Sequence, residues 1–104
     1  MANDVEAVAA EVVDEKNVIK LSKPLPNGAD ELVFDFDKIS GIQLIDCEKK
    51  AKKQDPTIMV PSLSMIYQAM VAAKATGVKY DDIIGLKGPD FTAACMRAQN
   101  FLLQ

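Results

Sequence analysis

Apolar residues recur at three- and four-residue steps in the stretch SLSMIYQAMVAAKATG, which runs from Ser62 to Gly77. This spacing places side chains on one helical face and predicts the central core helix. Pro61 and Ser62 supply starting signals, and Gly77 can adopt the left-handed conformation that ends a helix. The predicted inward face consists of Leu63, Ile66, Tyr67, Met70 and Ala73.

Two segments nearer the start alternate apolar and polar residues, which is the period of a β-strand. They cover residues 17–23 and residues 32–37, and Pro26-Asn27-Gly28 lies between them. Asn and Gly tolerate the positive φ of tight turns. We therefore expect an antiparallel hairpin lying on helices, since an isolated hairpin is marginally stable in water. Its predicted apolar face consists of Ile19, Leu21, Leu32, Phe34 and Phe36.

A second helix is predicted from Ser40, which can cap it, to about Gln54, before the stop signal of Asp55-Pro56. Its broad apolar face consists of Ile42, Leu44, Ile45, Cys47 and Ala51.

Residues 80–86 predict a short helical turn, and residues 90–103 predict the last helix. Gly85, Gly88 and Pro89 separate the two, and Asp90 or Gly88 is the expected cap of the last helix. Because its centre is rich in alanine, we expect it to pack closely along the helix of residues 62–77. The predicted inward residues of the short turn are Ile83, Ile84 and Leu86, and those of the last helix are Phe91, Ala94, Cys95, Ala98, Phe101 and Leu102.

The predicted fold class is α+β: a two-stranded antiparallel hairpin packed on a bundle of about three main helices, with a short extra helical turn. Residues 17–104 are expected to form a single domain, since the whole chain has 104 residues. Residues 1–16 are an acidic N-terminal extension. Two interpretations of it stay open, a short amphipathic helix that orders against a partner and a frayed tail. Its apolar residues at helical spacing are Val5, Val8, Ala9, Val12 and Val13.

Charge and composition exclude several classes of protein. The net charge of −3 does not favour a phosphate-binding surface, so we expect no nucleic-acid partner. The basic cluster from Lys49 to Lys53 is interpreted as a solvated helix end, with a nucleic-acid patch as the alternative. No apolar run reaches the roughly 18 residues of a membrane span, and the acidic start does not resemble a secretory signal. We expect a soluble, cytoplasmic protein with no membrane partner.

Residues with catalytic chemistry are few. The sequence has no histidine, and Cys47 and Cys95 lie far apart, so the usual zinc, triad and Cys–His sites cannot be built from this chain alone. Both thiols are predicted to be buried and apolar. Asp35 and Asp37 would share a strand face and could hold a cation, but solvation of that face is favoured because no further ligand is near in sequence. We therefore expect no enzymatic activity, no cofactor and no metal.

A partner-binding surface is predicted instead. Ile58, Met59 and Val60 form an apolar run in the connector between two helices, and they either tuck over the core or contribute to a binding patch, the first being favoured. Met96 and Phe101 of the last helix are predicted to join them as an exposed partner-binding surface. Open hairpin edges also favour a homo-oligomer of undetermined order.

The order of these signals resembles a known family. The chain resembles the phage tail assembly chaperones, small proteins of tailed phages and prophages. The segments that carry the resemblance are, in order, VIKLSKPL, LVFDF, a helix, a helix ending AKATG, VKYDDIIGL and the closing GPDFTAACMRAQNFL. The likeness covers about residues 18–103, and it consists of packing residues rather than a catalytic signature. The acidic residues 1–16 fall outside it.

The resemblance implies a non-enzymatic role. Members of this family bind the long, mostly helical tape measure protein and keep it soluble while the major tail protein polymerises around it in the bacterial host cytoplasm. A chaperone for an apolar helix needs an adaptable apolar groove, which Met59, Met65, Met70 and Met96 could supply. Two alternatives stay open: a structural virion or tail accessory protein that is retained in the particle, and a host-encoded adaptor.

Overall fold

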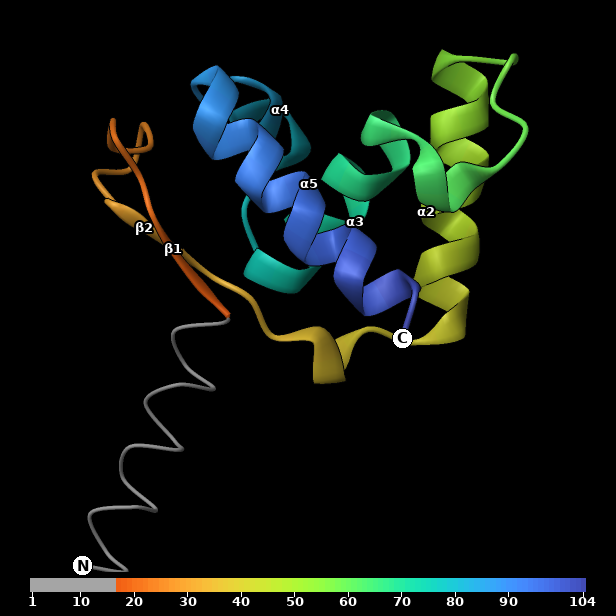
Figure 1. Cartoon of the computed structure of the whole chain (residues 1–104), viewed down its shortest axis with the longest axis horizontal. Coiled ribbons are helices and arrows are strands. Elements are labelled where there is room, and N and C mark those ends of the chain that lie inside the picture. Colours follow the sequence, from red (N-terminus) through yellow and green to blue (C-terminus); the bar gives the residue numbers. More distant parts are fainter. Residues whose placement is uncertain (1–16) are drawn as a thin grey trace, which may run out of the picture.

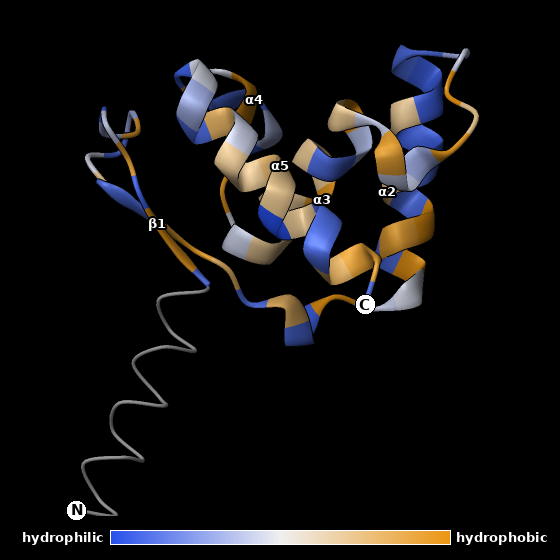
Figure 2. Cartoon of the chain, in the orientation of Figure 1, coloured by the Kyte–Doolittle hydropathy of each residue, from blue (hydrophilic) through white to orange (hydrophobic). Residues whose placement is uncertain are grey.

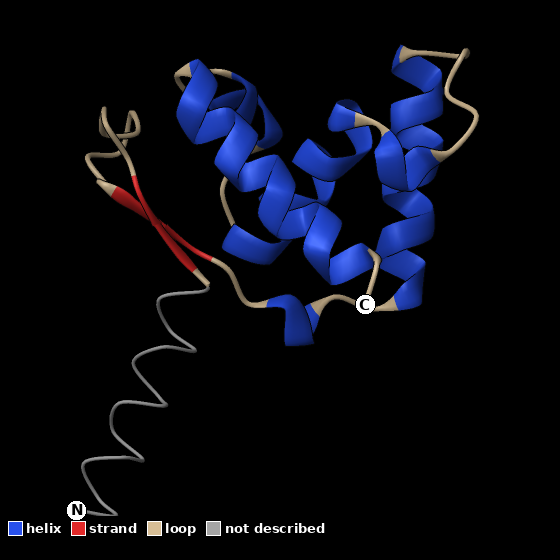
Figure 3. Cartoon of the chain, viewed as in Figure 1, coloured by secondary structure: helices blue, strands red, loops and turns tan. Residues whose placement is uncertain are grey.

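The structure is a computed structural model that describes residues 17–104. It has the α+β architecture that the sequence predicts, with an antiparallel two-stranded sheet at one edge of a group of helices (Figures 1 and 3). The predicted N-terminal helix or tail of residues 1–16 lies outside the described residues. No helix within residues 17–104 is both long enough and apolar enough to cross a membrane.

The hairpin consists of β1 (Val18–Lys20) and β2 (Glu31–Val33), with Ile19 opposite Leu32. The connecting loop turns at Gly28, whose φ of 89° favours glycine and whose N–H donates to the Leu25 carbonyl at 2.8 Å. The predicted alternation is correct where the strands pair. The apolar face of the sheet lies on the core, and its buried members are Ile19, Leu32 and Phe34.

The second strand is shorter than predicted. After Phe34 the backbone leaves the sheet, because the Asp35 N–H donates to the Ala75 carbonyl at 2.9 Å. Phe36–Lys38 then forms the 3₁₀ turn η1. Asp35 and Asp37 are therefore not neighbours on one strand face, and the cation site considered for them is not supported by their placement.

Helix α2 (Gly41–Gln54) begins at the predicted residue. The Gln43 side chain accepts from the Ser40 N–H at 2.9 Å, which closes one half of a capping box. Its contact with the core is narrower than predicted, since Ile42 and Ile45 lie in solvent. The buried residues of the helix are Cys47 and Ala51.

The stretch predicted as one helix divides into the 3₁₀ turn η2 (Pro61–Leu63) and helix α3 (Met65–Thr76). Ser64, not Ser62, is the N-cap of α3, and its hydroxyl accepts from the Tyr67 N–H at 3.4 Å. Gly77 ends α3 as predicted, with a left-handed φ of 72°.

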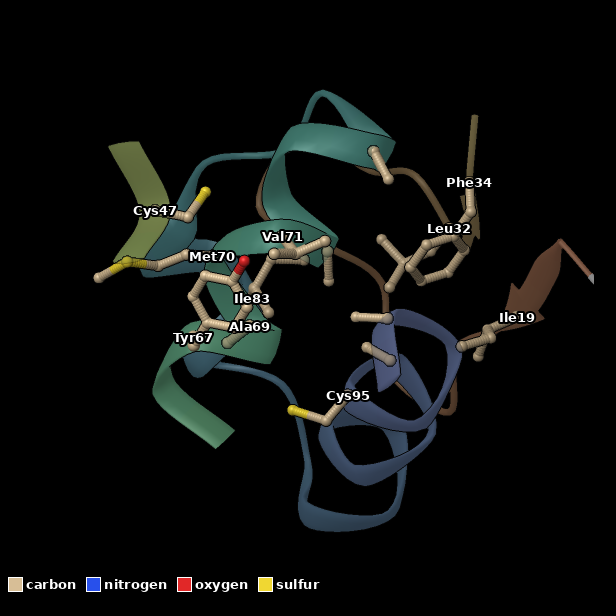
Figure 4. Close-up of a cluster of buried hydrophobic side chains, with 14 of the residues drawn as sticks. Ile19, Leu32, Phe34, Cys47, Tyr67, Ala69, Met70, Val71, Ile83 and Cys95 are labelled. Carbon is tan, nitrogen blue, oxygen red and sulfur yellow. The ribbon is translucent and has the colours of Figure 1, made fainter. Parts of the chain in front are cut away.

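Helix α3 is buried around most of its circumference rather than on one face, because α2 and α5 pack on it from different sides and β2 also contacts it. The prediction that Leu63 points inward is wrong, since it belongs to η2 and is exposed. Figure 4 shows the core side chains of α3 between those of the hairpin and α2. The buried residues of α3 are Tyr67, Gln68, Ala69, Met70, Val71, Ala72 and Ala75.

Two helices complete the fold, α4 (Tyr80–Ile84) and α5 (Gly88–Leu102). Ile83 is buried as predicted, but Ile84 points into solvent. Helix α5 packs along α3, as predicted, and alanines are fully buried on both helices at this contact. Small side chains allow the two backbones to approach closely, so this pair forms the centre of the domain.

Candidate functional site

The predicted partner surface begins in the connector between α2 and η2. Thr57 donates to the Asp55 carboxylate through its N–H at 3.0 Å and through its hydroxyl, and these bonds hold the pKa of Asp55 below its usual value. The Ile58 N–H donates to the Asp55 carbonyl at 3.2 Å, which closes the turn. Ile58 consequently packs against the core, so the tucked interpretation is correct for this residue.

The next two residues of the connector point outward. Met59 is 89% exposed and Val60 is 52% exposed, so the tucked interpretation is wrong for both of them. Leu63 and Met65 follow on the same segment and are also exposed. Four of seven consecutive residues therefore present large apolar side chains to solvent.

Helix α5 passes this segment at Cys95, the residue before Met96. The Cys95 Sγ lies 3.8 Å from the Met65 carbonyl, and η2 contacts α5. Met96 is 49% exposed, as predicted. Figure 2 shows hydrophobic residues over the connector after α2 and the turn that follows it. We define the apolar ridge as Met59, Val60, Leu63, Met65 and Met96.

The ridge has a rigid support that the sequence did not indicate. Gln68 is buried in α3, and its side-chain N–H donates to the Ser62 carbonyl at 2.7 Å. This bond fixes η2 on top of α3, because Ser62 is the middle residue of the 3₁₀ turn. A buried glutamine among apolar residues was the signal that could have revealed the contact.

Phe101 does not belong to the exposed surface that was predicted to contain it. It is half-buried and stacks on Phe36, with ring centroids 4.6 Å apart and an interplanar angle of 12°. Phe34 stacks in turn on Phe36 at 5.5 Å. The three rings join the end of α5 to the segment that follows the hairpin, so Phe101 has a structural position.

Asp90 is also placed differently from the prediction, which made it a candidate cap of α5. The N-cap position belongs to Lys87, and Asp90 is buried in the first turn. Its Oδ2 accepts from the Ser22 N–H at 2.9 Å and from the Ser22 hydroxyl at 2.8 Å. The carboxylate therefore attaches the hairpin loop to α5.

A groove lies apart from the apolar ridge, between the C-terminal half of α2, the C-terminal half of α3 and the start of α4. Its volume is about 660 Å³, which is within the range of binding pockets. The Tyr80 hydroxyl bonds to the Gln54 side chain at 3.2 Å at one side of it. Its apolar lining includes Cys47, Met70, Ala73 and Val78, and its lysines are Lys50, Lys53, Lys74 and Lys79.

The remaining candidate groups show no arrangement typical of catalysis or metal binding. Cys47 and Cys95 are free and buried, and Figure 4 places them at separate edges of the core. Burial raises the pKa of Cys47 and raises that of Cys95 to about 11, so neither thiol is activated as a nucleophile. Among residues 17–104, no three Cys, Asp or Glu side chains gather where they could hold a metal ion.

Comparisons with protein-family models, curated proteins and solved structures give no significant match to this chain. The likeness to phage tail assembly chaperones therefore stays a prediction from the sequence.

Proposed function

We propose that this protein is a non-enzymatic phage tail assembly chaperone that binds the tape measure protein through the apolar ridge. It keeps this long helical client soluble in the bacterial cytoplasm while the major tail protein assembles around it. The observation that supports the proposal is the ridge itself, because a small domain with a well-packed core leaves five large apolar side chains of η2, its flanking residues and the adjacent α5 exposed to solvent.

The chemistry of the ridge suits a helical apolar client. Three of its five residues are methionines, and the unbranched thioether side chain adapts to different apolar partners. The ridge spans two elements, η2 with its connector and α5, between which an amphipathic helix could lay its apolar face. Gln68 and the packing of α3 on α5 hold these elements in place, so little ordering of the backbone is needed on binding.

Co-expression with the tape measure protein of the same phage tests the proposal. Met59→Asp and Met96→Asp should each weaken client binding by at least about tenfold, since a methionine that becomes buried contributes about 1.5–3 kcal/mol. The soluble fraction of the client should fall accordingly. Neither side chain is buried in the domain, so thermal unfolding should stay near that of the wild type.

Val33→Asp is a matched control for Val60→Asp. The two valines are 54% and 52% exposed, but Val33 lies on the hairpin, away from the ridge. Equal loss of client solubility in both variants would contradict the proposal. Recovery of the chain from mature particles would favour the alternative of a virion accessory protein.

A further inference from the structure

The groove between α2, α3 and α4 shares no residue with the apolar ridge. All the charged residues that line it are positive. Four of its lining residues are lysines and none is an aspartate or glutamate. Lys50 is paired with Asp46 at 3.0 Å. Within residues 17–104, the other three groove lysines have no carboxylate within ion-pair distance. The groove therefore combines apolar walls with cations that are available to an acidic occupant.

The acidic complement is present in the same chain. Residues 1–16 contain five carboxylates and one lysine, whereas residues 17–104 contain 10 acidic and 11 basic side chains. As a helix, the segment would present Val5, Val8 and Val12 on one stripe, with Asp4 and Glu15 along one edge of it. The groove offers lysines on both walls, Lys50 and Lys53 from α2, and Lys74 and Lys79 from α3 and the loop after it.

The segment also enters the described domain close to the groove. The Asn17 carbonyl accepts from the Phe34 N–H at 2.7 Å, and the next residue, Asp35, donates to the Ala75 carbonyl at 2.9 Å. Ala75 is two residues before Gly77, which lines the groove. Residue 17 therefore lies within roughly 20 Å of the groove, a distance shorter than the roughly 24 Å length of a 16-residue helix.

We propose that residues 2–16 dock intramolecularly in the groove between α2, α3 and α4. The valine stripe covers the apolar lining, and the flanking carboxylates pair with the groove lysines. The acidic segment then acts as an internal occupant of this surface.

Backbone amide NMR spectra of the full chain test the proposal. In Val8→Asp with Val12→Asp, amide signals of Ala73, Gly77 and Val78 should shift relative to the wild type, while those of α5 around Ala94 should not. Unchanged spectra would refute the proposal.

Charge reversal separates docking from a general effect of charge. Lys53→Glu with Lys79→Glu should reproduce the amide shifts of the valine variant, and adding Asp4→Lys with Glu15→Lys should reverse them. The control variant Lys20→Glu with Lys23→Glu changes the net charge by the same amount as the groove variant, but on the hairpin and its loop. It should leave the groove signals in place. If the control moves these signals as strongly, the proposal is wrong. Groove shifts that depend on protein concentration, with a doubled molecular mass, would also overturn it, since the segment would then occupy a second copy.

Discussion

The bond between Asp90 and Ser22 offers the sharpest test of how the hairpin is attached to the helices. One carboxylate oxygen accepts both the N–H and the hydroxyl of a residue 68 positions away, and Asp90 is only 8% exposed. Hydrogen bonds to a charged group contribute about 1.5–3 kcal/mol each. Asp90→Ala removes both bonds and leaves the Ser22 N–H without its partner.

Because Ser22 is exposed, water replaces part of the lost bonding, and we expect Asp90→Ala to lower the free energy of unfolding by about 2–4 kcal/mol, less than two full charged bonds would contribute. This is a large part of the total stability of a small domain. Ser22→Ala keeps the backbone bond and should cost about 1 kcal/mol. Asp90→Asn keeps an acceptor but loses the charge, so it should fall between these values. The double variant Ser22→Ala with Asp90→Ala should lose about 1 kcal/mol less than the sum of the two single variants. The reason is that both single variants remove the same hydroxyl bond, which the double variant loses only once.

Urea unfolding followed by circular dichroism measures these values. Asp81→Ala is the control, since Asp81 lies in the first turn of α4, is exposed, and can lose only the favourable interaction with the helix dipole, about 0.3–1 kcal/mol. If Asp90→Ala costs no more than Asp81→Ala, the attachment contributes nothing and the reasoning fails. Additive costs in the double variant would show that the two groups act independently.

Three further predictions concern the core and the chain turns. Gly77→Ala should destabilise by about 1–2 kcal/mol because its φ is 72°, whereas Gly41→Ala in the first turn of α2 should be neutral or stabilising; chemical unfolding distinguishes the signs. The pKa of the Cys95 thiol is about 11 in the folded protein and about 9 in the unfolded chain, so the unfolded chain loses this proton first. The free energy of unfolding should therefore fall as the pH rises above 9, and this pH-dependent loss should vanish in Cys95→Ala. Phe101→Ala should cost about 2–4 kcal/mol by removing the ring stacked on Phe36, and an unchanged unfolding midpoint would refute that role.

The proposed chaperone function and the proposed docking of residues 2–16 concern different faces of the domain. The apolar ridge lies on η2, its connector and α5, whereas the groove lies between α2, α3 and α4. Client binding can therefore fail on substitution of Met59 while groove occupancy is unchanged, and substitution of Lys79 should have the opposite effect.

Part of the candidate site could be predicted from the sequence. The exposure of Met96 was predicted, because an outer helix position needs only a local argument, whereas Met59 and Val60 are exposed although the favoured interpretation tucked them over the core. Ile58 and Phe101 could not be placed in this way, since each is covered by a distant part of the chain. The groove was also missed, because its lysines come from separate segments that only the packing of α2 on α3 brings together.

The sequence by itself determined the features that depend on neighbours a few residues apart. The pairing of the two alternating segments, the capping of α2 by Ser40 and the end of α3 at Gly77 all follow from local periodicity, side-chain reach or permitted φ. Only the tertiary structure decided which apolar residues are covered, because burial depends on what packs against each face. Two partners surround α3 while Ile42 stays in solvent, and a carboxylate suited to a helix start instead binds a loop 68 residues away.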